Sequence, residues 1–186
     1  MSVNQRLFSV TSLLLKLGTW FCWFIIAVLT LALGAAVVGL GVALVAPAML
    51  TQLDLPPELL ALPLVPMLGA ILFAVGGGLI CMVFILLAVR ATTGIVDTAV
   101  AGDPFVAENA ERLKRIGWCM VGVTVVQFLT LMAVAMIVPE HLPEGGNLSG
   151  GSEPDPVGIL SILLIFVLAS IFRNGTQMRD ELEGMV

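Results

Sequence analysis

The stretch LVPMLGAILFAVGGGLICMVFILLAV, residues 64–89, carries no charged side chain and decides the class of fold. Three further apolar stretches occupy residues 17–46, 116–138 and 157–172. A helix needs about 20 apolar residues to cross the hydrocarbon core of a bilayer, with a range of roughly 17 to 25. The fourth stretch is the shortest and recruits Arg173, whose apolar stem lets its charge reach the interface. We therefore expect four transmembrane helices.

The overall composition also indicates a membrane protein. Of the 186 residues, 59% are hydrophobic and only 11% are charged, whereas soluble domains are about 25% charged. Continuous apolar runs do not match the short alternating strands of a membrane barrel. The predicted fold is all-α: a single membrane domain over residues 1–186, built as an integral membrane four-helix bundle.

All basic residues fall on one side of this topology. Arg6 and Lys16 precede the first span, and the remainder lie between the second and third spans or after the fourth: Arg90, Arg112, Lys114, Arg115, Arg173 and Arg179. The other two connections, at about residues 47–63 and 139–156, contain acidic residues but no basic ones. Because cytoplasmic loops are enriched in Lys and Arg, the sequence predicts a multi-pass protein with both termini in the cytoplasm.

The inner connection, at about residues 90–116, is predicted to form a cytoplasmic helical hairpin between helices two and three. Helical spacing continues beyond Arg90 until Gly102, which suits the end of a helix. Asp103 is then expected to cap the next helix, with Pro104 at its first position. Two ion pairs are expected along the second arm, Glu108 with Arg112 and Glu111 with Arg115. The two arms are expected to pack against each other through Ile95, Val96 and Ala99 on one side and Phe105, Asn109 and Leu113 on the other.

Each of three segments has two possible interpretations. Residues 4–16 form either a short helix on the membrane surface or an extension of the first span. Residues 76–78, three glycines in a row, either kink the second helix or allow close packing. The hairpin is either a docking surface for a soluble partner or a stable means of reversing the chain. Residues 173–186 are expected to extend the fourth helix.

Few residues within the spans carry chemistry. No span contains Asp, Glu, Lys, Arg or His between its ends, which argues against ion-coupled transport. Gln127 is the membrane-buried polar residue nearest the middle of the third span. We expect it to form an interhelical hydrogen bond, for example with Ser161, in preference to binding a ligand.

The sequence predicts neither catalysis nor a cofactor. No nucleophile is paired with a visible base, so we expect the protein not to be an enzyme. The lone His141 does not make a metal site, because such a site needs several ligands. The thiols of Cys22, Cys81 and Cys119 lie in three different spans. They are expected to act as small hydrophobic side chains in preference to a redox cluster.

Two inner segments carry a family resemblance. The first comprises Gly-Asp-Pro-Phe-Val at 102–106, Asn-Ala at 109–110 and Arg-Leu-Lys-Arg-Ile-Gly at 112–117, and the second is Ile-Phe-Arg-Asn-Gly at 171–175. With the number of helices and the placement of the loops, this pattern resembles the bacterial four-helix membrane family known as domain-of-unknown-function family twenty-nine seventy-five. The resemblance implies a small inner-membrane protein of unassigned activity, often encoded beside a short helix-turn-helix regulator.

This resemblance implies a regulatory protein whose inner hairpin and tail bind a cytoplasmic partner, such as a helix-turn-helix transcription regulator. The candidate partner-binding residues are Phe105, which is expected to pack under the turn, Asn109, which is expected to bond across the arms, and Arg112, Lys114, Arg115 and Arg173. A second copy of the chain is another candidate partner, and direct nucleic-acid binding is not expected. The alternative functions are a small permease or channel component, or an accessory subunit of a membrane complex.

Overall fold

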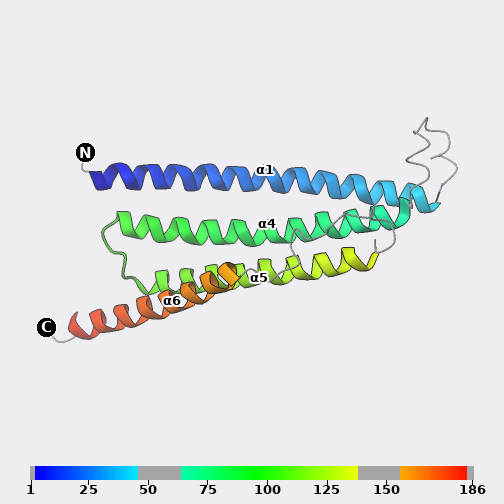
Figure 1. The fold of residues 1–186 in the computed structure, drawn as a ribbon. Helices are drawn as coiled ribbons and strands as arrows, with labels where there is room; N and C mark the ends of the chain where they lie inside the picture. The colour runs from blue at the N-terminus through cyan, green and yellow to red at the C-terminus, as the bar shows by residue number, and fades with distance from the viewer. Residues whose placement is uncertain (1–2, 46–63, 138–155, 184–186) are drawn as a thin grey trace. The chain divides into compact units, whose positions relative to one another are not determined.

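The computed structural model describes residues 3–45, 64–137 and 156–183. Over these residues the chain forms four helices and no strand: α1 (Val3–Val45), α4 (Leu64–Val100), α5 (Ala107–Ile137) and α6 (Pro156–Glu183) (Figure 1). The predicted all-α class is therefore confirmed. The connections predicted at about 47–63 and 139–156 lie almost wholly outside the described residues, as does His141.

The four helices correspond to the four predicted apolar stretches, and each is long and apolar enough to cross a membrane. Many large apolar side chains point away from the protein; Trp20 and Leu31 are both 77% exposed, for example. Such a surface is unfavourable in water and favourable against lipid. The chain is therefore a multi-pass membrane protein.

The helix ends follow local sequence signals. Pro156 occupies the first position of α6, where its missing N–H is not needed and its fixed φ angle suits the helix. Residues 4–16 extend the first span and do not form a separate surface helix, because α1 is continuous from Val3. The predicted extension of the fourth helix is also confirmed, since α6 continues to Glu183.

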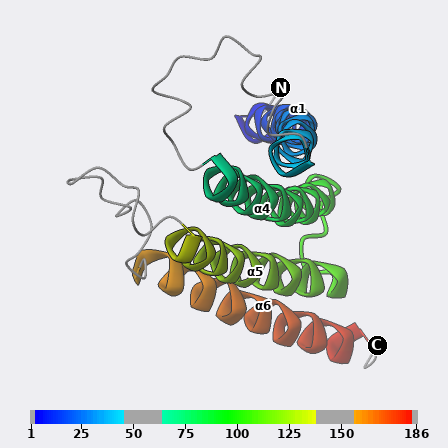
Figure 2. The ribbon, with the colours of Figure 1, turned by 90° about the vertical axis from the view of Figure 1, so that its right-hand side faces the viewer.

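The chain divides into two compact units. Unit 1 comprises Met1–Phe24, Met82–Thr124 and Pro154–Val186, and so contains the α4–α5 turn and all of α6. Within it α6 runs beside α5 (Figure 2), where the ring of Phe166 meets Trp118 edge-on at 5.7 Å. Arg90 of α4 lies over the Trp23 ring of α1 at 5.9 Å, a cation–π contact that ties these two helices.

Unit 2 comprises Ile25–Cys81 and Val125–Glu153. Its helices approach closely at Gly77, which is buried and where an added Cβ would overlap the hydroxyl of Thr130. Gly39 meets Leu68 in the same unit, with 3.7 Å between the position of an added Cβ and the leucine methyl. Close packing is therefore the role of at least the central glycine of the 76–78 triplet.

Candidate functional site at the turn between α4 and α5

α4 ends at Val100 and is followed by Gly102, which has a φ angle of 91°. The Gly102 N–H donates to the Ala99 carbonyl and the Asp103 N–H donates to the Thr98 carbonyl, each at 3.2 Å. This pair of bonds is the Schellman arrangement, which satisfies carbonyls that would otherwise have no partner at the helix end. The prediction that Gly102 caps this helix is confirmed.

The predicted start of the next helix is wrong. α5 begins at Ala107, three residues after Pro104. Asp103 does not cap it, because its carboxylate, which would have to accept N–H groups of the next helix, pairs with Arg179. The Asp103 N–H completes the end of α4. A short non-helical segment at 103–106 is needed to redirect the chain before α5 starts.

Asn109 organises the inside of the turn. Its side chain is completely buried, and its amide nitrogen donates to Thr98 Oγ1 at 2.7 Å and to the Pro104 carbonyl at 2.9 Å. Its amide oxygen accepts a bond from Arg112 Nη1 at 2.7 Å. Both amide hydrogens and the oxygen are thus used, as a buried amide requires. The prediction that Asn109 bonds across the arms is confirmed, while its partner Thr98 was not anticipated.

Arg112 joins the same network. Its Nη1 also donates to the Gly94 carbonyl of α4 at 2.8 Å. Gly94 makes room for this contact, since an added Cβ would lie 2.8 Å from Arg112 Nε. We call the side-chain bonds among Gly94, Thr98, Asn109 and Arg112 the Asn109 network.

The predicted pairs Glu108–Arg112 and Glu111–Arg115 do not form, since the ion pair found among the described residues joins Asp103 and Arg179. Arg112 instead binds two acceptors that are fixed in place by the fold. A carbonyl and a buried amide hold the guanidinium without the loss of side-chain entropy that a surface glutamate would require.

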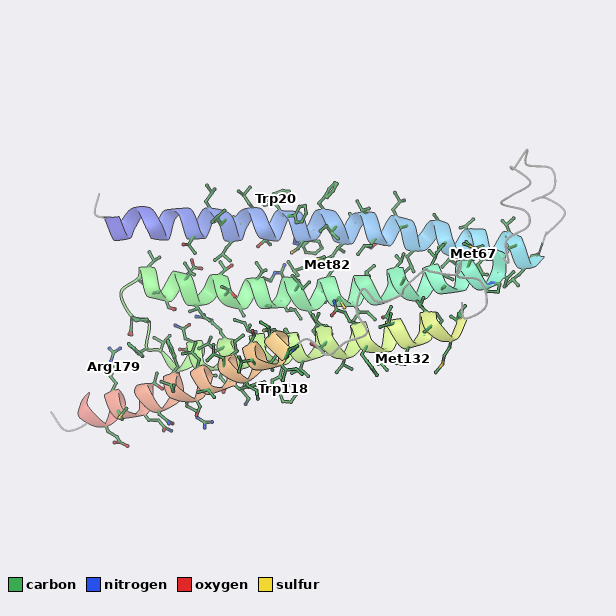
Figure 3. All side chains as sticks on the ribbon, viewed as in Figure 1. Trp20, Met67, Met82, Trp118, Met132 and Arg179 are labelled. Carbon is green, nitrogen blue, oxygen red and sulfur yellow. The ribbon has the colours of Figure 1, made fainter. Side chains whose placement is uncertain are left out.

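The end of α6 contacts the turn through two interactions, which we call the clasp. Arg179 Nη1 lies 2.6 Å from Asp103 Oδ1, and Figure 3 shows Arg179 projecting from α6 toward the turn. The Phe105 ring stacks on Phe172 with centroids 5.3 Å apart. Phe105 remains 49% exposed. Its expected position under the turn is therefore corrected to a contact with α6.

A family model described as "Protein of unknown function (DUF2975)" matches residues 53–186. The chain belongs to this family. The match covers α4, α5 and α6 and confirms the family suggested by the residues of the turn and tail. No curated protein and no solved structure matches this DUF2975 chain.

The other candidate residues of the DUF2975 chain separate into two groups. Lys114, Arg115 and Arg173 are exposed in unit 1, and none of them forms an ion pair within the described part of the chain. Gln127 is exposed in unit 2. The hydroxyl of Ser161, its expected partner, donates to the Val157 carbonyl in its own helix at 2.7 Å.

The side chains of all three cysteines are buried. Among the described residues, no group of three or more His, Cys, Asp or Glu side chains could hold a metal ion. The features that distinguish this part of the DUF2975 chain are therefore the Asn109 network, the clasp and the exposed charges around them.

Sequence reasoning missed Thr98, Gly94, Asp103 and Arg179 as members of this site. The available signal for the Gly94–Arg112 contact was a glycine in the first arm of the predicted hairpin and an arginine in the second.

Proposed function

We propose that this DUF2975 chain is a regulatory protein of the bacterial inner membrane. Both termini and the α4–α5 turn lie in the cytoplasm in this proposal, because every basic residue precedes the first span, follows the fourth, or lies in the connection between the second and third. The turn and the end of α6 together bind a cytoplasmic protein. A helix-turn-helix DNA-binding regulator is the proposed partner, as the family resemblance suggests.

The observation that carries this proposal is that the turn has the clasp in addition to the Asn109 network. The buried bonds of Asn109 already fix the turn that reverses the chain. The clasp is therefore not needed for that purpose. The contacts Asp103–Arg179 and Phe105–Phe172 add the tail to the turn. They create one continuous surface from segments far apart in sequence, and a preorganised surface loses less entropy on binding.

The chemistry of this surface suits a protein partner. Phe105 presents a half-exposed aromatic ring, and Glu108 and Arg115 are exposed charges on the first turns of α5. Aromatic and arginine side chains are enriched among the residues that dominate binding energy in protein interfaces. The surrounding charges would set the orientation and the association rate of a charged partner.

The test is affinity purification of the tagged full-length protein in mild detergent, followed by mass spectrometry. The variant reverses two exposed charges, Glu108→Lys and Arg115→Glu, and leaves the Asn109 network intact. The matched control reverses Lys16, an exposed basic residue on α1. We expect one soluble helix-turn-helix protein to copurify with the wild type and the control and to be lost from the variant. Recovery of only membrane proteins with all three would refute the proposal.

A further inference from the structure

A second feature of unit 1 lies between α5 and α6, on the side of α5 that faces α6. A hollow of about 140 Å³ opens there, and its lining combines apolar and charged side chains. Phe166 and Ala169 form its apolar part, and the polar part comprises Glu111 and Lys114 from α5 with Ser170 and Arg173 from α6. Neither the Asn109 network nor the clasp uses these four polar side chains.

The hollow has unused capacity to bind an anion. Lys114 and Arg173 contribute two positive charges against one carboxylate, from Glu111. Within the described residues neither cation forms an ion pair, and Ser170 offers a hydroxyl beside them. A guanidinium binds phosphate oxygens through two parallel N–H bonds, while an ammonium acts as a compact point charge. Two cations and a hydroxyl around one hollow are suited to a phosphate group.

The position of the hollow points to lipid as the source of that phosphate. Lys114 lies one helical turn from Trp118, whose ring packs edge-on against Phe166. Trp118 is 60% exposed, and exposed tryptophans favour the interface between the membrane and water. The charged part of the hollow thus adjoins a residue that marks the level of lipid headgroups. The apolar part adjoins the level of the acyl chains.

We propose that this hollow binds the headgroup of an anionic phospholipid of the phosphatidylglycerol type. Lys114 and Arg173 hold its phosphodiester, Ser170 donates a further hydrogen bond, and the Glu111 carboxylate accepts a bond from a headgroup hydroxyl. Basic hollows between transmembrane helices commonly bind such headgroups. The orientation proposed above is used only to assign the lipid to the inner leaflet. The site itself does not depend on a protein partner.

Trp118 provides a local probe for the test. A Trp20→Phe, Trp23→Phe background leaves it as the sole tryptophan. The full-length protein is reconstituted into vesicles of phosphatidylcholine and phosphatidylglycerol in which one lipid at a time carries brominated acyl chains. Quenching of Trp118 by each lipid then gives the relative affinity of the two headgroups. We expect a preference for phosphatidylglycerol that falls about five-fold for each basic residue removed.

The test variant is Lys114→Gln with Arg173→Gln, and the matched control is Lys16→Gln with Arg90→Gln. The control removes two exposed basic side chains of the same unit that do not line the hollow. Loss of the preference in the variant and its retention in the control would support the site. Equal preference in wild type and variant, or equal loss in the control, would overturn it. Displacement of phosphatidylglycerol by excess inorganic phosphate at constant ionic strength would reassign the hollow to free phosphate.

Discussion

The side-chain amide of Asn109 donates to Thr98 Oγ1 at 2.7 Å and so joins the first turn of α5 to the last turns of α4. The hydroxyl of Thr98 in turn donates to the Ile95 carbonyl at 2.9 Å. The Asn109 side chain is completely buried, and each of its polar atoms has a hydrogen-bond partner. A buried group that loses its partner costs more than the net gain of one hydrogen bond.

Replacing Asn109 by Ala should therefore destabilise unit 1 measurably. The change leaves the Thr98 hydroxyl and the Pro104 carbonyl without their donor and removes one acceptor from Arg112. We expect a loss of about 1–3 kcal/mol, measured by thermal unfolding in detergent. Thr98→Ser retains the hydroxyl and serves as the control, which should unfold close to the wild-type temperature. Equal stability of Asn109→Ala and wild type would contradict the role of the network.

Gly94→Ala should disturb the same network from the side of α4. The new methyl group would lie 2.8 Å from Arg112 Nε and displace the guanidinium from the Gly94 carbonyl. Bonds to charged groups contribute about 1.5–3 kcal/mol, so a loss of this size is expected in the same unfolding assay. In an Arg112→Gln background the substitution should cost much less. A cost that does not depend on residue 112 would show that helix packing, and not the guanidinium, is the cause.

Gly102→Ala should weaken the turn through backbone strain. The φ angle of 91° at Gly102 is one that residues with a side chain rarely adopt, and a left-handed conformation costs them about 1–2 kcal/mol. Gly102→Asn should be tolerated better, because asparagine enters this region more easily. Hydrogen exchange of the amides at 98–106 is the appropriate measurement. Identical exchange in all three proteins would argue against strain at this position.

The ion pair of the clasp should contribute little to stability by itself. Both of its side chains are close to half exposed, at 46% and 44%, and exposed pairs contribute about 0.2–1 kcal/mol. A double-mutant cycle of Asp103→Asn and Arg179→Gln should give a coupling in this range that decreases at high salt. Phe105→Ala should cost more, because it removes the stacked ring. A coupling of several kcal/mol would mean that the pair is more protected from solvent than its exposure indicates.

Neighbouring glycines in α4 should respond differently to the same substitution. A Cβ at Gly77 would overlap the Thr130 hydroxyl, whereas one at Gly76 would meet nothing within 4 Å. Overpacking costs about 1–3 kcal/mol, so Gly77→Ala should lower the unfolding temperature while Gly76→Ala leaves it unchanged or raises it. Thr130→Ala should restore part of the loss at Gly77. Equal effects at both glycines would refute close packing as the reason for the triplet.

The helices and the end of α4 could be predicted because their signals are local. Hydropathy places each span, and Gly102 supplies its own φ preference. The start of α5 could not be predicted from Asp103 and Pro104, because the Asp103 carboxylate, which would accept N–H groups at a helix start, is paired with Arg179 from a distant part of the chain. Pairing rules at i,i+4 describe isolated helices. They could not predict that Arg112 would bond to the Gly94 carbonyl, which lies eighteen positions away on another helix. The Asp103–Arg179 pair spans 76 positions and has no local signal.

The guanidinium of Arg112 has a mechanical consequence. It is bonded at once to the Gly94 carbonyl on α4 and to Asn109 on its own helix, while Asn109 bonds back to Thr98. A slide of α5 along α4 by even one residue would break both bonds that join the two helices, Arg112 to the Gly94 carbonyl and Asn109 to Thr98 Oγ1. Piston-like movement between these helices is therefore blocked at this end. Any signal that passes through the turn must travel as a tilt or rotation of the two helix ends as one piece.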